Sequence, residues 1–244
     1  MKKGTIVGKR NRVGPASGLV LMLAVAGAAR GATAQYPSMA PPAQYMMDRS
    51  EEIAMARSAA PSSISNDAAV LILGAHGFES GAKGTNQFVC LVERSWDKPF
   101  ADPEFWNPKM RGPVCVNGAA ARTVLPTLLE RAEWALSGLS PAEMRERSKT
   151  SAKANMTPAT GAMSFMLSKK QYLSDSDGQW YPHVMFFSPG IDPIAWGANL
   201  KASPVLGASI SSRLTMFFIP VRKWSDGTLA DYGTPAESSR HHHH

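Results

Sequence analysis

The chain has few of the residues that usually build metal sites and thiol sites. Its 244 residues include only two cysteines, Cys90 and Cys115, and six histidines. Four of these histidines form the terminal run 241–244, which we set aside as a tag remnant or an unstructured tail. Only His76 and His183 remain in the body of the chain. We therefore predict that the protein holds no metal ion and no cofactor.

Two common catalytic motifs are also missing. No Gly-x-Ser-x-Gly occurs, although the segment Leu71–Phe78 has the strand followed by His-Gly that precedes the oxyanion hole in α/β-hydrolases. No Cys-x-x-Cys occurs either, and neither cysteine follows a cationic helix start that would lower its pKa. These absences exclude a nucleophile elbow and a redox dithiol.

The apolar run Leu19–Ala26 is too short to span a bilayer. Basic residues precede it, and the small-residue sequence Ala32-Thr33-Ala34 follows it. This is the pattern of a secretory signal peptide over residues 1–34, with cleavage near Ala34. We therefore expect an exported protein, periplasmic or extracellular, with no membrane span in the mature chain.

An excess of positive charge is missing once the leader is removed. The net charge of +7 comes from 26 basic and 19 acidic residues, and residues 1–34 contain six of the basic residues and no acidic one. The mature chain therefore has 20 basic and 19 acidic residues. Nucleic-acid partners, which favour a basic surface, are not predicted.

Two cysteines in an exported chain most often pair. A Cys90–Cys115 disulfide would close a loop with 24 residues between the cysteines. Closing a loop of this size stabilises a fold by about 3 kcal/mol in the chain-entropy model. We predict that this disulfide tethers the loop to the strand that contains Cys90.

The tethered loop is rich in aromatic residues: Trp96, Phe100, Phe105 and Trp106 lie among four prolines. These side chains suit a stacking surface for the sugar rings of a glycan, for a small molecule or for a partner protein. The alternative is a small aromatic core beneath the loop, because that many exposed aromatics would favour aggregation. We name these four residues as the candidate binding residues and leave both interpretations open.

His76 and His183 are the candidate acid–base groups, since each lies at the end of a predicted strand. If those strands are neighbours, the two rings could meet and form a metal or acid–base site with Glu79 or Asp192. The alternative is two unrelated histidines that bond to local backbone.

The pattern of apolar residues predicts an α+β fold with an antiparallel sheet of about five strands and helices clustered mid-chain. We expect a linker over residues 35–49, a single domain over 50–228 and a flexible tail over 229–244. A helix is expected over 50–59, and the first two strands are expected to pair as a hairpin. The five strands are predicted at 70–78, 88–94, 163–168, 182–187 and 214–221.

Two further helices are predicted in the middle of the chain. Asn117 is the expected cap of a helix over 118–137, which Gly138 should end. Pro126 should either kink this helix or mark where its regular part begins. Ser140 and Glu143 form a capping box that opens a charged surface helix to about residue 154.

Five short segments together resemble uncharacterised exported bacterial proteins. The resemblance implies a single domain and a structural Cys90–Cys115 pair, but it implies no activity and no site residue. From the loop aromatics we expect a binding protein that uses the tethered loop. The alternative is a secreted hydrolase or metal-dependent enzyme that uses His76 and His183. The segments are Gly84-Thr85-Asn86-x-Phe88-x-Cys90, Phe105-Trp106-Asn107-Pro108, Pro113-x-Cys115, Arg122-Thr123-x-Leu125-Pro126 and Pro182-His183-x-Met185-Phe186.

Overall fold

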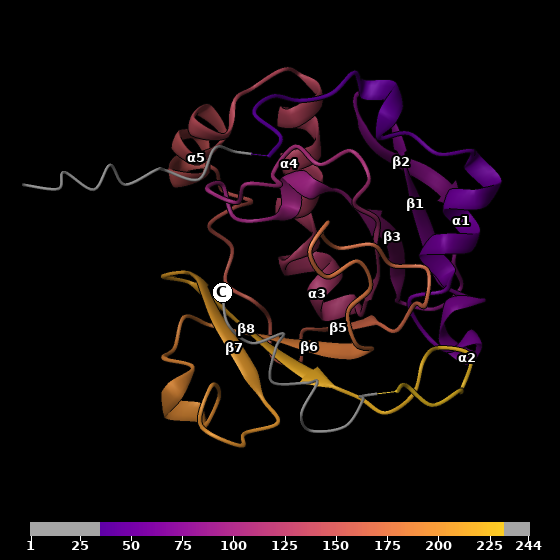
Figure 1. Ribbon diagram of the computed structural model, residues 1–244, viewed down its shortest axis with the longest axis vertical. Coiled ribbons are helices and arrows are strands. Elements are labelled where there is room, and N and C mark those ends of the chain that lie inside the picture. The colour runs from indigo at the N-terminus through magenta and orange to yellow at the C-terminus, as the bar shows by residue number, and fades with distance from the viewer. Residues whose placement is uncertain (1–34, 232–244) are drawn as a thin grey trace, which may run out of the picture. The chain divides into compact units, whose positions relative to one another are not determined.

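An eight-stranded mixed sheet with helices on both of its faces organises the protein (Figure 1). The structure is a computed structural model that describes residues 35–231. The predicted signal peptide, its cleavage site and the histidine run lie outside the described residues.

The strands follow the order β2-β1-β3-β4-β5-β6-β8-β7 across the sheet. Strands β1 and β3 are parallel, and every other neighbouring pair in this sheet is antiparallel. The strands are β1 (Ala69–Gly74), β2 (Gly77–Ala82), β3 (Val89–Glu93), β4 (Gly112–Val116), β5 (Met163–Met166), β6 (His183–Ser188), β7 (Leu206–Ser211) and β8 (Leu214–Pro220).

The helices lie before the sheet, within the tethered loop and between β4 and β5 in the sequence, with one more turn before β7. The α-helices are α1 (Arg49–Arg57), α2 (Ser62–Ser65), α3 (Gly118–Thr123), α4 (Leu125–Leu136) and α5 (Pro141–Thr150). The 3-10 helices are η1 (Pro42–Gln44), η2 (Ser95–Asp97) and η3 (Ile194–Trp196).

The α+β class is confirmed, but the prediction of about five antiparallel strands is wrong. Strands β2, β4 and β7 were missed, and β2 and β7 form the two edges of the sheet. An edge strand needs no continuous apolar run, and β2 reads Gly-Phe-Glu-Ser-Gly-Ala. The predicted hairpin between the first two strands is also wrong. The chain turns back after Gly74 to pair β1 with β2, and β3 then lies parallel to β1.

Side chains on β3 alternate between the two faces of the sheet. Cys90 and Val92 pack with Ala56 of α1 on one face. Leu91 packs with Ala120 of α3 on the other face. The same alternation directs Glu93, the last residue of β3, to the α3 face and the following residue, Arg94, to the α1 face. The two charged residues therefore have different surroundings.

The predicted disulfide is confirmed. Cys90 and Cys115 are directly opposite each other in the antiparallel β3–β4 pair, and their Cα atoms are 4.0 Å apart. Both residues are fully buried on the α1 face. The disulfide therefore joins β3 and β4 within the sheet, three residue pairs away from Glu93 and Gly112, where the tethered loop leaves the sheet and returns to it.

The predicted helices form with shifted boundaries. Asp48 caps α1, because the Asp48 carboxylate accepts hydrogen bonds from the backbone N–H groups of Ser50 and Glu51. The Asn117 side chain caps α3 through the N–H of Ala120. The expected single helix over 118–137 is broken at Val124, since Pro126 has no N–H to continue the helical bonding.

The capping box of α5 is confirmed. The Ser140 hydroxyl accepts from the Glu143 N–H, and the Glu143 carboxylate accepts from the Ser140 N–H at 2.8 Å. Gly138 has a φ of +86°, which suits glycine at the end of α4.

The segment before α1, which we expected to be a linker, packs against the rest of the fold. Tyr45 is fully buried, and its hydroxyl donates to the Trp106 carbonyl at 2.8 Å. Tyr36 donates to the Asp175 carboxylate at 2.6 Å. Among the helices between residues 35 and 231, none combines the length and the hydropathy needed to cross a bilayer.

Candidate functional site

Three of the four loop aromatics lie in a core cluster. Trp96, Phe105 and Trp106 are 0%, 2% and 5% exposed, and they pack with residues such as Tyr45. The Phe105 and Trp106 rings meet edge to face, with centroids 4.7 Å apart. These three side chains therefore build the aromatic core that the sequence left as the alternative, and they offer no free ring face. Phe100 is half-buried and lines a cavity.

The structure does not bring His76 and His183 together. His76 lies exposed in the turn between β1 and β2, and His183 begins β6. Strands β3, β4 and β5 lie between β1 and β6 in the sheet. Four strand spacings correspond to a separation of about 19 Å. Glu79 stays near the His76 turn, on edge strand β2, where it faces Arg49 at 3.8 Å.

His183 has the surroundings of a structural histidine. Its ring packs against Trp180 and Phe218, with centroid distances of 4.5 Å and 6.0 Å. Its Nδ1 is 2.8 Å from the Tyr181 carbonyl oxygen. Burial lowers the pKa of His183 to about 4, so the ring is neutral at physiological pH. Across residues 35–231, His, Cys, Asp and Glu side chains form no group of three or more that could hold a metal ion.

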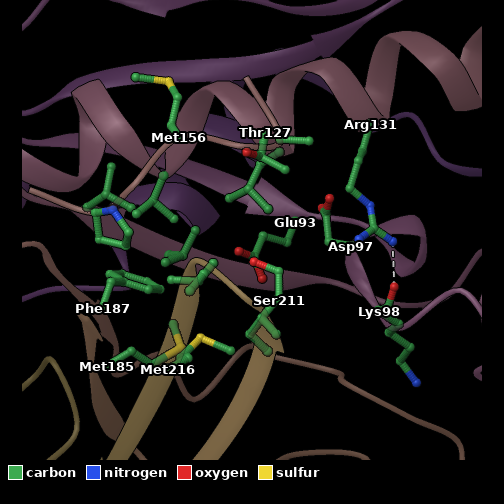
Figure 2. A pocket seen from close by; sticks show the side chains of 18 of the residues that line it. Glu93, Asp97, Lys98, Thr127, Arg131, Met156, Met185, Phe187, Ser211 and Met216 are labelled. Atoms are coloured by element: carbon green, nitrogen blue, oxygen red, sulfur yellow. Dashed lines mark hydrogen bonds between the residues drawn. The ribbon is translucent and has the colours of Figure 1, made fainter. Parts of the chain in front are cut away.

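The main hollow is a cavity of about 560 Å³ between the helices and the sheet (Figure 2). This volume is in the range of sites that hold drug-sized ligands. Apolar side chains form most of its wall. From the helices come Val124 and Leu128, and from the sheet come Val114, Met166, Met185, Phe187, Met216 and Phe218.

Charged side chains gather at one end of this cavity. Glu93 is the last residue of β3, Asp97 ends η2, and Arg131 reaches down from α4 beside Asp97 (Figure 2). Lys98 and Phe100 follow Asp97 in the tethered loop and also line the wall. The disulfide-tethered loop thus supplies the polar end of the cavity.

The hydrogen bonds of this polar end are incomplete. One Asp97 oxygen, Oδ2, accepts from the Arg94 backbone N–H at 3.2 Å, but the buried Oδ1 has no partner. The Arg131 Nε is also buried without a partner. Within the described residues, no hydrogen bond or ion pair holds the Glu93 carboxyl group. Buried polar groups are normally satisfied, so Asp97 Oδ1 and Arg131 Nε point to an occupant, and the half-buried Glu93 carboxyl group is free to contact it.

Arg131 is held in place by its other atoms. Its Nη2 donates to the Lys98 carbonyl, and its guanidinium lies over the Phe100 ring, 4.4 Å from the centroid. Burial lowers the pKa of Arg131, while the nearby Asp97 and Glu93 oppose that shift. The guanidinium is positioned beside the two carboxyl groups without forming a direct hydrogen bond to Asp97 Oδ1.

The two carboxyl groups differ in their titration. Burial, with a further contribution from the charge of Asp97, raises the pKa of Glu93 to about 8. Burial raises the pKa of Asp97 to about 6, against the opposing charge of Arg131. Burial therefore favours the protonated form of both carboxyl groups, and it does so more strongly for Glu93.

Sequence reasoning missed Glu93, Asp97 and Arg131, although two of them leave a signal. Glu93 directly continues the apolar run of β3, where a charge is unexpected. Arg131 lies three residues after Leu128 and seven after Val124, on the apolar stripe of α4. Asp97 lies in an irregular loop, and only the tertiary fold brings it to the other two.

Comparison with protein-family models, with curated proteins and with solved structures gave no match. The function therefore has to be inferred from the cavity and its residues. The walls of the cavity are largely apolar, and Glu93, Asp97 and Arg131 form a polar end whose hydrogen bonds are incomplete.

Proposed function

We propose that this protein is an exported binding domain for a small amphipathic molecule, which it holds in the cavity between the sheet and α3–α4. The observation that carries the proposal is the cavity of about 560 Å³ with apolar walls and one polar end. A site of this kind suits a ligand whose apolar body is buried and whose polar group is oriented at one point.

The apolar walls support burial of a hydrocarbon or aromatic body. Met166, Met185 and Met216 come from three different strands and face the cavity. Methionine side chains are unbranched and flexible, so such a wall adapts to ligands of different outline. Burial of the ligand would contribute roughly 25 cal/mol for each Å² of apolar surface removed from water.

In this proposal the tethered loop still takes part in binding, through Phe100 of the four predicted aromatics and through Asp97 and Lys98. Trp96, Phe105 and Trp106 are instead buried in the core. Export is part of the proposal, and the buried Cys90–Cys115 disulfide is compatible with an oxidising compartment.

A fluorescence titration with Nile red, an uncharged apolar dye, tests this proposal. The mature chain is expected to bind the dye with a blue shift and a saturable increase in emission. Met216→Trp, which fills part of the cavity from β8, should weaken binding at least about tenfold, since a bulky ring removes the space that the dye needs. Met47→Trp is the matched control, because Met47 is half-buried and lies outside the cavity wall.

Equal dye affinity in the wild type and in Met216→Trp would contradict the proposal. Binding would then occur on the surface rather than in the cavity. Circular dichroism and thermal unfolding of both tryptophan variants would show that the comparison is made between folded proteins.

A second candidate is a hydrolase that uses Glu93 and Asp97 in place of the two histidines. The specific observation in its favour is a pair of carboxyl groups at the end of a cavity, where burial raises the pKa of Glu93 more than that of Asp97, as the division of roles in general acid–base catalysis requires. A panel of p-nitrophenyl esters and glycosides with apolar groups tests it. Turnover that is lost in Glu93→Gln would support catalysis, and turnover that is equal in both proteins would reject this site.

A further inference from the structure

The charged groups at the polar end of the cavity do not balance when both carboxyl groups are ionised. We infer that the cavity takes a ligand with a cationic amine head, an alkyl- or aralkylammonium, which lies between Glu93 and Asp97. This inference rests on the proposed function, since it names the chemical class of the ligand of that same cavity.

The cations already present at the cavity are largely committed to other groups. Lys98 Nζ is 3.2 Å from Glu104 Oε2 and 3.6 Å from Asp102 Oδ1. Lys149 Nζ is 2.7 Å from Glu146 Oε1. Arg131 is therefore the cation that faces the two carboxyl groups, and one guanidinium can balance only one of them.

An ammonium head fits the atoms that lack partners. It has three N–H donors and no acceptor. Asp97 Oδ1 is buried and without a donor, and the Glu93 carboxyl group has no hydrogen bond within the described residues. An ammonium that donates to both makes two charge-assisted bonds, which are stronger than bonds to a neutral head.

Other head groups fit less well. A carboxylate head would be repelled by the Asp97 charge, and it has no donor to offer to the Asp97 and Glu93 oxygens. A hydroxyl head has a single donor and so would satisfy only one of the two carboxyl groups. The ring of Phe100 beside Arg131 adds an aromatic face at the same end, which also favours a cation.

Binding of an ammonium should expel a proton. In the ligand-free protein burial and the Asp97 charge oppose the ionisation of Glu93 and raise its pKa. A cation between the two carboxyl groups reverses the balance and lowers the pKa of Glu93. The other charged or titratable groups that line the cavity are Lys98 of the loop, Arg131 of α4, Lys149 of α5 and His183 of β6.

Isothermal titration calorimetry with three ligands of one chain length tests the inference. The probes are dodecylammonium, dodecanol and dodecanoate, each below its aggregation concentration, at pH 7 with the mature chain. We expect dodecylammonium to bind at least about tenfold more tightly than the other two, a difference that one charge-assisted bond supplies. Measurement in two buffers of different ionisation enthalpy should show release of close to one proton.

Glu93→Gln should lose the preference for the amine and the proton release, because the glutamine amide cannot ionise. Glu133→Gln is the matched control: it removes one carboxylate from an exposed position on α4 and should keep both properties. Circular dichroism would confirm that Glu93→Gln is folded.

Two negative results have different meanings. If Nile red binds in the cavity but dodecylammonium binds no more tightly than dodecanol or dodecanoate, the cationic head is wrong and the proposed binding function stands. If neither Nile red nor any of the three ligands binds, the proposed function is wrong and the inference falls with it. A preference for the amine that persists unchanged in Glu93→Gln would also overturn the inference.

Discussion

Glu93 and Arg94 are consecutive residues with opposite surroundings. Arg94 is fully buried and paired with Glu52 on one face of the sheet, whereas the half-buried Glu93 on the other face has no hydrogen-bond or ion-pair partner within residues 35–231. Arg94 lies on the α1 face and is 0% exposed. Its Nη2 is 2.8 Å from Glu52 Oε1, and its Nε donates to the Tyr45 carbonyl at 2.8 Å. Glu52 also accepts the backbone N–H of Leu73 at 3.2 Å. Both side chains of this ion pair are almost completely buried, so a ligand cannot reach them.

Glu93 points the other way, into the cavity, and has no such partners. The comparison teaches that the protein does not avoid buried charge in general. On one face it surrounds a charged pair with hydrogen bonds, and on the other it leaves carboxyl groups open beside an apolar space. Buried polar atoms without partners also occur elsewhere in residues 35–231, but of the residues that carry them Asp97 and Arg131 are the two that line this cavity, which is typical of a functional site.

The largest loss of stability is expected on the α1 face, where Arg94 and Glu52 are paired. Arg94→Met leaves Glu52 buried without its cation and should lower the free energy of unfolding by about 3–5 kcal/mol. Arg131→Met, on the cavity side, should cost only about 1 kcal/mol, because Arg131 bonds one carbonyl and the cavity is open to water. Urea unfolding of both variants checks this. Equal losses of stability in the two variants would contradict the claim that the two faces treat their charged residues differently.

The disulfide also belongs to the α1 face, and its removal should have the next largest effect. Replacing both Cys90 and Cys115 with alanine should lower the free energy of unfolding by about 3 kcal/mol, since the unfolded chain regains the freedom of the loop. Nile red binding to the folded double variant should stay within about twofold of the wild type. Loss of dye binding in a folded double variant would show that the two faces are not independent.

A smaller effect with a defined pH dependence is expected for Glu93→Gln. Because the pKa of Glu93 rises from 4.5 to about 8 on folding, the folded state retains a proton that the unfolded state has released between these values. The stability contribution of Glu93 therefore falls as pH rises through this window. Glu93→Gln should be more stable than the wild type at pH 8 by on the order of 2 kcal/mol, allowing for water in the cavity.

At pH 4 the two proteins should have the same stability, because Glu93 is protonated in both states. Asp97 contributes a similar dependence between pH 3.8 and about 6, and it is present in both proteins. Urea unfolding at several pH values would separate the two contributions. If the free energy of unfolding changed with pH in the same way for the wild type and for Glu93→Gln, the claim that Glu93 is an ionisable group without partners would be contradicted.

Local signals in the sequence were sufficient for the starts of two helices and for the disulfide. The Ser140–Glu143 capping box, the Asn117 cap and the Cys90–Cys115 pair depend on neighbouring residues or on compartment, and all three are present. Strand pairing is a longer-range property. The parallel β1–β3 contact depends on β2 folding outward as an edge, which its polar sequence did not reveal.

The candidate site was harder to predict for the same reason. His76 and His183 attracted attention because imidazole is rare and reactive, but the sheet order separates them. Glu93, Asp97 and Arg131 are residue types found on any protein surface. They are recognised as a candidate site only from their burial and from the hydrogen-bond partners that they lack, and both become visible only in the folded structure.

The most direct measurement of the central claim is a carbon-13 NMR titration of the side-chain carboxyl groups of Glu93 and Glu52, with and without dodecylammonium. The account predicts that Glu93 titrates near pH 8 in the free protein and well below pH 7 in the complex, while Glu52, closed by Arg94, does not respond to the ligand. A Glu93 pKa near 4.5 in the free protein would contradict it, because that value belongs to a carboxyl group already solvated or paired.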